Sequence, residues 1–428
     1  MARHPAEQQS GRCAAGSREP RDGWHHARGP DDAASARRHR RHRRRATQRH
    51  RHPEPSRALS TRHPLRSRGQ AGQRIRARPG GHRVLSGAAY EVVEVSARQD
   101  REQVLALWEG NLGSGTRLGL KYDWFYVDCP ADAPLVMSLL QRETEERVGV
   151  VAAGERRMLW RGQPVRAALM VDLAVAPEHR WLGPALILQR RMKQVAAERY
   201  DLLYVFPNPL ATPVYLRAGY SHLGEIVRYA RVLRHQGYLA RHLPRPLAWA
   251  GGSLLDVFDR VRRRLRARPC RHEWVDRSTD DMDRLWASSH HGDGPITVRD
   301  RAYLDWRFDR SPLASTRYLL LRADDGRLEA WFACQAREDN ILHVHDFWSV
   351  DAVEGLARTR VDTLLHAANA AGHRAVWFEF AGASASMAGW LAAGFKPRSR
   401  RPVFGHATTC PPQALAATLH LTAADEDE

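Results

Sequence analysis

The pattern of apolar and polar residues predicts strands and helices in regular succession after residue 90. Residues 90–95 alternate as a half-buried strand does, and 98–110 carry apolar side chains at helical spacing. The same criteria then predict, in chain order, strands at 135–142, 147–153 and 166–175, a helix at 184–199, a strand at 201–206, a helix at 211–218 and a strand at 224–233. This part of the chain is therefore expected to form a mixed α/β fold.

A second stretch of the same character begins near residue 271. It predicts a helix at 279–289, strands near 317–322, 328–336 and 340–348, a helix at 354–371, a strand at 375–380 and a short helix at 385–393. Between the two stretches, a proline-punctuated connector precedes an amphipathic helix at 253–266 with an arginine-rich polar face. We interpret this helix as a link between domains, and a helix lying on a membrane surface is the alternative.

The first 89 residues have a different composition. They contain almost no Ile, Val, Leu or Phe, and their 22 Arg and six acidic residues account for +16 of the net charge of +19. Such a segment cannot bury enough apolar surface to offset its chain entropy, so we predict that it is disordered. The remainder is close to neutral, which does not indicate a nucleic-acid-binding body.

Two interpretations of this basic segment stay open. The arginine and histidine run at 37–45 would attract a nucleic acid or an acidic membrane surface. Alternatively, the chain has 64 Arg but only three Lys, as a GC-rich coding sequence produces, and the segment then represents upstream sequence read as coding. In that case translation would start near residue 84.

These patterns define the expected organisation and exclude several classes of protein. We expect a basic segment (1–89), a first domain (90–240), a linker (241–270), a second domain (271–410) and an acidic tail (411–428) that frays over Thr422–Glu428. No run of 18 apolar residues predicts a membrane-spanning helix. The five cysteines are scattered without a CxxC, which argues against a disulfide scaffold or structural zinc and favours a cytoplasmic location. No set of His, Cys and acidic residues has metal-ligand spacing, so no metal is expected.

The segment most informative about chemistry runs from Val171 to Leu188. A predicted strand ends in a tight loop, Arg180-Trp-Leu-Gly183-Pro-Ala185, which opens directly into a helix. The first turn of a helix has unpaired backbone N–H groups and a partial positive charge. Because glycine lets the backbone approach a ligand closely, this loop is suited to hold a diphosphate.

A second motif follows the next strand. Asn208 is followed by Ala211, Tyr215, Gly219 and Tyr220, at spacings of three, seven, eleven and twelve residues. Together the two motifs resemble those of the GNAT (GCN5-related) N-acetyltransferase superfamily, over roughly residues 90–235. The resemblance implies the GNAT fold and direct transfer of an acetyl group from acetyl-CoA to an amine.

The resemblance also implies a role for each matching residue. Tyr215 would be the general acid that protonates the departing CoA thiolate, and Asp172 would accept the amine proton directly or through water. Asn208 would hydrogen-bond the cofactor or a nearby backbone group. The backbone of the preceding strand would pair with pantetheine, and the loop would surround the diphosphate. These cofactor-binding residues are Leu173, Val175, Arg180, Trp181, Leu182, Gly183 and Ala185.

The sequence departs from the family pattern at the loop. Trp181 stands where glycine is frequent, and its bulk would crowd the diphosphate. Pro184 lacks an N–H and removes one donor, although proline is well tolerated in the first turn of a helix. The nearby aromatic cluster at 122–126 is interpreted as hydrophobic core, with the lining of the acceptor site as the alternative.

The second stretch, from residue 271, resembles a degenerate copy of the first. When Gly394-Phe395 is laid on Gly219-Tyr220, Trp390 takes the place of Tyr215. The loop after strand 340–348 has no Arg-x-x-Gly and instead carries Asp351 and Glu354, which would repel a diphosphate. We therefore predict a second GNAT-like domain without catalysis of its own, which shapes the acceptor cleft or mediates contacts.

The sequence leaves the acceptor open among an amino sugar, a small amine, an amino acid and a protein amine. One alternative keeps the fold but changes the donor, as in the FemAB-like aminoacyl transferases, which use aminoacyl-tRNA. Another is a non-catalytic binding or scaffold protein in which Trp181 and Pro184 mark a dead cofactor loop. The retained diphosphate loop favours CoA.

Overall fold

A computed structural model describes residues 89–235, 269–408 and 411–427 without 417, together with five positions between 251 and 257. The segment 1–88, predicted to be disordered, lies outside the described residues, as does most of the helix predicted at 253–266. Residues 81–428 belong to one compact unit. Everything below concerns the described residues of that unit.

The first part of the chain, 90–232, has the predicted elements and several more. The hairpin of β3 and β4 runs beyond the predicted strand ends, because Arg161 and Gly162 at its tip both have positive φ, as a tight two-residue turn requires. The elements are β1 (Tyr90–Val95), α2 (Arg101–Trp108), α3 (Thr116–Tyr122), the π-helix η2 (Asp123–Val127), β2 (Leu135–Gln141), β3 (Arg147–Trp160), β4 (Gln163–Val175), η3 (Pro177–His179), α4 (Leu182–Arg199), β5 (Leu202–Val205), α5 (Thr212–Arg217) and β6 (Ser221–Val232).

The second part, 271–407, follows a similar order of elements, with the short elements β8, η5 and η6 added. Its last strand, β13, escaped sequence prediction because two prolines, three arginines and a lysine interrupt its apolar pattern. The elements are β7 (Arg271–Val275), α8 (Asp280–Ser288), β8 (Ile296–Thr297), α9 (Arg301–Leu304), the π-helix η4 (Asp305–Asp309), β9 (Arg317–Arg322), β10 (Leu328–Arg337), η5 (Glu338–Asn340), β11 (Ile341–Ser349), α10 (Ala352–Gly355), α11 (Arg358–Ala370), β12 (Ala375–Gly382), η6 (Ala385–Met387), α12 (Ala388–Ala392) and β13 (Lys396–Ala407).

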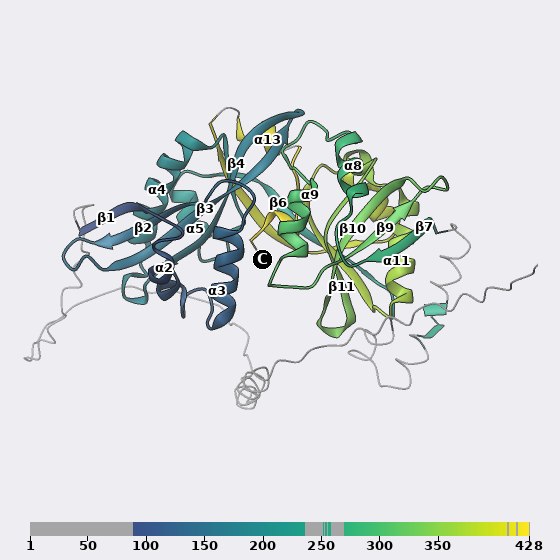
Figure 1. Cartoon of the computed structure of the whole chain (residues 1–428), viewed down its shortest axis with the longest axis horizontal. Coiled ribbons are helices and arrows are strands. Elements are labelled where there is room, and N and C mark those ends of the chain that lie inside the picture. Colours follow the sequence, from purple (N-terminus) through teal and green to yellow (C-terminus); the bar gives the residue numbers. More distant parts are fainter. Residues whose placement is uncertain are drawn as a thin grey trace, which may run out of the picture. The chain divides into compact units, whose positions relative to one another are not determined.

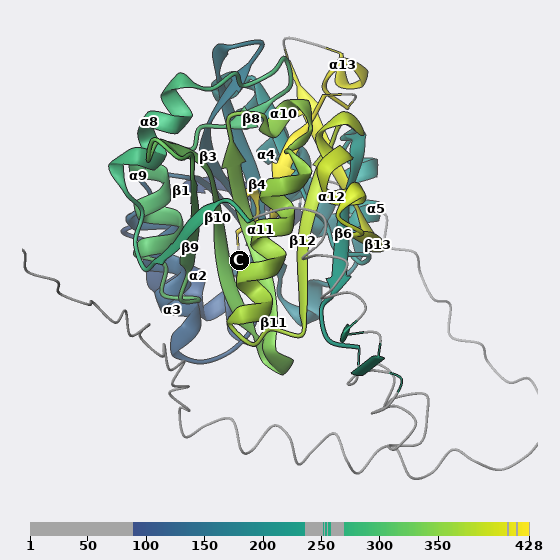
Figure 2. The same cartoon turned by 90° about the vertical axis from the view of Figure 1, so that its right-hand side faces the viewer.

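The two parts share one continuous sheet and exchange their last strands. The strand order is β1-β2-β3-β4-β5-β13-β6-β12-β11-β10-β9-β7. Strand β13 of the second part thus pairs with β5 of the first, and β6 pairs with β12. In Figure 1, β1 to β4 lie on the left and β7 and β9 to β11 on the right, while Figure 2 shows α11 over the strands of the second part.

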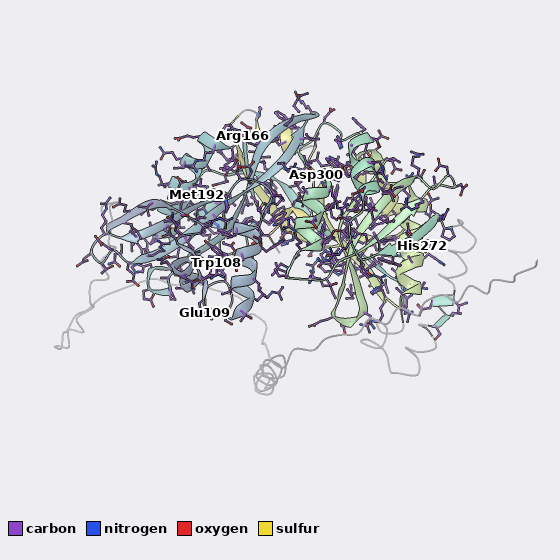
Figure 3. The ribbon with its side chains drawn as sticks, viewed as in Figure 1. Trp108, Glu109, Arg166, Met192, His272 and Asp300 are labelled. Carbon is purple, nitrogen blue, oxygen red and sulfur yellow. The ribbon has the colours of Figure 1, made fainter. Side chains whose placement is uncertain are left out.

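The aromatic cluster at 122–126 is largely core, as expected. Trp108, labelled in Figure 3, packs against the stacked rings of Tyr122 and Tyr126. Trp124 of η2 stacks on Trp306 of η4 with ring centroids 5.1 Å apart. Each indole N–H donates to the other residue's carbonyl, at 2.7 and 2.8 Å. The two π-helices therefore join the two parts of the chain.

The prediction that the acidic tail frays is wrong. After α13 (Pro412–Ala416), strand β14 (His420–Thr422) pairs with β12, and the short helix η7 (Ala423–Asp425) is closed by a capping box. The Arg299 guanidinium lies between the carboxylates of Asp346 and Asp425, and all three side chains are fully buried. Arg401 pairs with Glu426. Asp425 and Glu426 hold the tail inside because each meets an arginine, whereas free in solution these carboxylates would keep it hydrated.

The buried Asp346 predicts a pH dependence of stability. Burial raises its pKa to about 6, with Arg299 opposing the shift and Asp425 adding to it. Because the folded protein holds this proton more tightly than the unfolded chain, stability falls as pH rises from about 4 to 6. At about 1.4 kcal/mol per pKa unit, the wild type should lose up to about 3 kcal/mol over this range relative to Asp346→Asn. Urea unfolding of both proteins at pH 4, 5, 6 and 7 measures the difference, and parallel curves would contradict the prediction.

Candidate active site

A gap opens in the sheet where β4 and β5 separate. These parallel strands pair at three positions only, from Ala167 with Leu202 to Leu169 with Tyr204. Strand β4 continues for six more residues to Val175, and no strand among the described residues pairs with it on that side. The main-chain groups of this edge need other partners. An extended ligand can therefore pair with β4 here.

A bulge in β4 lies beside the gap. Asp172 and Leu173 of β4 stand opposite the single residue Val151 of β3. Asp172 has a φ of 54°, a strained conformation for a residue other than glycine. The bulge turns the Asp172 carboxylate toward the face of the sheet that α3 and η2 cover.

Two side chains contact this carboxylate, and a second carboxylate completes a largely buried charge cluster. Lys121 bridges Asp172 and Asp427, with Nζ to carboxylate distances of 2.9 and 2.6 Å. The Tyr126 hydroxyl donates to Asp172 Oδ2 at 2.8 Å. Burial raises the pKa of Asp172. At Asp427 burial is also the largest single effect, but the charge and hydrogen bond of Lys121, a backbone hydrogen bond and the charge of Arg307 together outweigh it and lower the pKa. The Lys121 ammonium thus pairs with two carboxylates. Of these, Asp172 takes up a proton more readily than Asp427.

Sequence reasoning found Asp172 but missed its partners. Lys121 is one of only three lysines in the chain, and this rarity was the one feature of the sequence that could have marked it as functional. Tyr126 belonged to the cluster assigned to the core, and Asp427 to the tail expected to fray. A contact between residues 121 and 427 spans 306 positions, which no local pattern can reveal.

Tyr215 lies in α5 and is only 2% exposed. Gln189 of α4 donates its amide to the Tyr215 hydroxyl at 3.2 Å. Burial raises the Tyr215 pKa, and the charges of Asp427 and Asp172 raise it further. The phenol therefore keeps its proton and lies within electrostatic range of the charge cluster. Gln189 was missed too, although it shares the buried stripe of α4 with Met192 and Ala196.

The loop before α4 is covered by its own tryptophan. Trp181 is the N-cap residue of α4, and its ring lies so close to Gly183 that a Cβ there would be 1.8 Å from a ring atom. A side chain at position 183 would therefore have to displace the indole. Arg180 points back to the end of β4, where its Nε donates to the Val175 carbonyl at 3.1 Å and its Nη2 donates to Asn111.

The remaining predicted residues have simpler surroundings. Asn208 closes the turn that leads into α5, because its Oδ1 accepts from the Ala211 N–H at 2.9 Å, so its observed partner is a nearby backbone group. Leu173 follows Asp172 in the bulge, and Leu182 and Ala185 lie in the first turn of α4. Six residues separate Gly183 from Gln189, which corresponds to about 9 Å along the helix axis.

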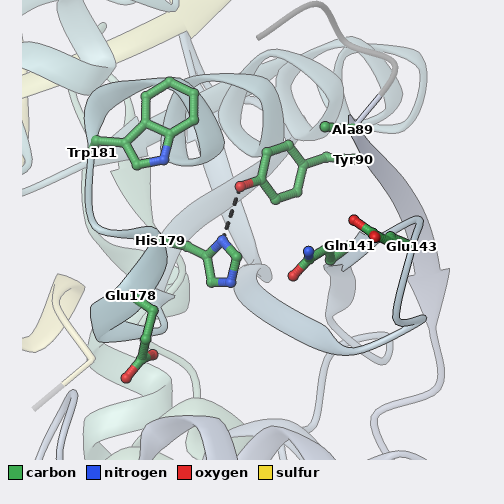
Figure 4. A pocket seen from close by; sticks show the side chains of 7 residues that line it. All are labelled: Ala89, Tyr90, Gln141, Glu143, Glu178, His179 and Trp181. Atoms are coloured by element: carbon green, nitrogen blue, oxygen red, sulfur yellow. Dashed lines mark hydrogen bonds between the residues drawn. The ribbon is translucent and has the colours of Figure 1, made fainter. Parts of the chain in front are cut away.

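A pocket of about 620 Å³ lies beside Trp181, which is one of the residues that line it. Figure 4 shows Tyr90, whose hydroxyl is 2.9 Å from His179 Nδ1, between Trp181 and the end of β2. Glu143 and Glu178 also line this pocket. Since their carboxylates would repel phosphate, the pocket is not suited to a diphosphate.

In the second part of the chain the corresponding gap is filled. Strands β11 and β12 separate after four paired positions, and β14 then pairs with β12 while Thr422 donates to Asp346 of β11. The carboxylate of Asp351 accepts from the Ala357 N–H at the start of α11, where an anion would bind. Trp390, which corresponds to Tyr215, is fully buried. Among the described residues, no three His, Cys, Asp or Glu side chains are arranged to hold a metal, and no helix is long and apolar enough to cross a membrane.

Comparisons with known proteins support the fold. No protein-family model matches the sequence, and no curated protein matches it. The structure is similar to that of a probable N-acyltransferase from Enterococcus faecalis V583, with a TM-score of 0.52 and 12% identity over 77% of this chain and 74% of that one. It is also similar to a GCN5-related N-acetyltransferase from Anabaena variabilis ATCC 29413, with a TM-score of 0.52 and 14% identity over 74% and 72% of the two chains. The described part of the chain therefore has a GNAT-like fold.

Proposed function

We propose that the protein is a CoA-dependent acyltransferase that moves an acetyl group from acetyl-CoA directly to an amine. The observation that carries this proposal is the separation of β4 and β5 beside Asp172, which leaves a free strand edge next to a buried acid. The pantetheine arm would pair with this edge at Leu173 and Val175. The first turn of α4, near Gly183, would receive the diphosphate.

In the proposed reaction the amine attacks the thioester carbonyl. The new C–N bond forms, the C–S bond breaks, and Tyr215 gives its proton to the departing sulfur. Asp172 accepts the proton that the amine loses, and burial, which raises its pKa, makes this carboxylate a stronger base than an exposed one. Lys121 and Tyr126 hold the carboxylate in place.

Release of CoA from acetyl-CoA tests this function. The full chain is incubated with acetyl-CoA and a panel of amino sugars, small amines, amino acids and peptides, and free thiol is measured with a chromogenic reagent. We expect release that depends on both the protein and one acceptor class. No release with any acceptor, together with no change in melting temperature on adding acetyl-CoA, would contradict the proposal and favour a scaffold or an aminoacyl-tRNA-dependent enzyme.

The indole over Gly183 is the specific observation that favours the scaffold alternative, and it leads to a prediction. Replacing Trp181 by alanine should uncover the first turn of α4 and strengthen CoA binding about 10-fold, or about 1.4 kcal/mol. Calorimetric titration with CoA measures the change. The matched control is Leu182→Ala, because Leu182 is equally exposed, at 39% against 40%, but does not cover Gly183. Weaker binding in Trp181→Ala would show that the indole itself contacts CoA.

A further inference from the structure

Arg156 is a buried cation whose donors are mostly unused. It lies in β3 and is 2% exposed. Its Nη1 donates to the carbonyl of Glu155 at 2.8 Å. Its Nε and Nη2 are fully buried and have no hydrogen-bond partner among the residues that the structure describes. Because a buried charge without a partner is strongly unfavourable, this guanidinium calls for an anion that the described residues do not supply.

Aromatic rings hold the guanidinium in position. Its Cζ lies 4.9 Å from the Phe125 ring centroid and 5.1 Å from that of Trp306. Gly154 makes room for this arrangement, since a Cβ there would be 2.7 Å from the Phe125 ring. Ring faces attract a cation, but they leave the in-plane N–H donors unsatisfied. The surroundings thus fix the orientation of Arg156 without neutralising it.

The two unused donors lie on the same edge of the guanidinium, the edge that binds a carboxylate with two parallel hydrogen bonds. Arg101 uses this edge in the same protein. Its Nε and Nη2 donate to the two carboxylate oxygens of Asp123 at 2.7 and 2.9 Å. Arg156 therefore presents the same pair of donors without the carboxylate.

Arg156 lies on the face of the sheet that also holds the charge cluster. Arg307 lies within electrostatic range of both Arg156 and the charge cluster. Burial lowers the pKa of Arg307, and the charges of both Arg156 and Asp427 act on it. Arg307 also lies over the ring of Trp124, which stacks on the Trp306 ring beside Arg156. A ligand held at Arg156 would thus share a face with the candidate base.

We propose that Arg156 binds a carboxylate of the acyl acceptor, so that the acceptor is an amine that also carries a carboxylate, as amino acids do. This inference rests on the proposed function and narrows its substrate class. The carboxylate pairs with Nε and Nη2 of Arg156, while the amine points toward Asp172.

A binding experiment tests the site without requiring turnover. Melting temperatures of the full chain are measured in sodium chloride and in sodium acetate of equal ionic strength and pH, for wild type, Arg156→Met and Arg101→Met. Acetate should raise the melting temperature of wild type and of Arg101→Met by about 1–3 °C and leave Arg156→Met unchanged. Equal stabilisation of all three proteins, or of none, would overturn the proposed site. In chloride, Arg156→Met should melt at least as high as wild type, because no acid loses its partner.

A kinetic experiment then separates this inference from the proposed function. Amino acids from glycine to 6-aminohexanoate are compared with their amides as acceptors. We expect kcat/KM for the best acid to exceed that for its amide about 10-fold or more in wild type, and the preference to disappear in Arg156→Met. Equal use of acids and amides by both proteins would reject the acceptor class but keep the acyltransferase. Arg156-dependent stabilisation by acetate without transfer to any acceptor would keep the site and reject the function.

Discussion

Tyr215→Phe is expected to slow acyl transfer about 100-fold or more while CoA affinity changes less than twofold. The substitution removes one hydroxyl and keeps the ring packed between α4 and α5. Transfer slows because the departing thiolate loses its proton donor, and a positioned general acid contributes about 100-fold or more. Binding persists because the phenol is 2% exposed and the ring provides the packing. Steady-state kinetics with acetyl-CoA and the best acceptor, together with calorimetric titration of CoA, measure both quantities.

Tyr220→Phe is the matched control. Its ring meets that of Tyr215 edge to face, with centroids 5.2 Å apart, and is equally buried. The Tyr220 hydroxyl has no hydrogen-bond partner among the described residues, so its removal should leave turnover near the wild-type level. If both variants lost the same activity, the effect would come from packing around α5, and the acid role of Tyr215 would be wrong.

Local pattern was sufficient to predict most strands and helices. Strand β1 was predicted with its observed bounds because its tyrosine and three valines, interrupted by two exposed glutamates, are typical of a strand. Strand β13 was missed because the first five of its twelve residues are exposed and polar. The exchange of β6 and β13 cannot be predicted from either sequence segment. The pairing partner and register of each strand are set by contacts between residues far apart in the chain.

The candidate site, too, was predicted where its residues follow a local pattern and missed where they depend on distant contacts. The two motifs located Gly183 and Tyr215, because a loop and a helix start are encoded locally. The role of Trp181 as a cover over Gly183 was only suspected from its bulk, and its ring position needed the fold. Lys121 and Asp427 could not be predicted from the sequence. An acidic residue in a polar tail is expected to be solvated, and only the fold shows that a lysine lies beside it.

The tail connects the filled gap of the second part to the open gap of the first. It leaves β14 beside β12, passes Arg299 at Asp425, and reaches Lys121 at Asp427. The order of the site thus depends on whether the buried charges of the second part hold the tail. This dependence can be tested at Arg299, which no substrate needs to touch.

Arg299→Met is expected to destabilise the protein by about 3–5 kcal/mol, because it leaves Asp346 and Asp425 buried with no opposite charge between them. Urea unfolding at pH 7 measures the loss. Turnover should fall along with stability, because a loosened tail withdraws Asp427 from Lys121. The affinity for CoA should change little, because the first turn of α4 and the edge of β4 do not contact the tail residues that Arg299 holds.

Arg401→Met provides the comparison. Arg401 also pairs with the tail, at Glu426, but its side chain is 38% exposed and its other partner, Glu379, keeps Arg228, so its loss should cost less than that of Arg299. Adding Asp346→Asn to Arg299→Met should recover part of the lost stability, since one of the two stranded charges is gone. A loss below about 1 kcal/mol in Arg299→Met, or no recovery in the double variant, would show that the tail is held by its apolar contacts and β14 pairing rather than by the buried charges.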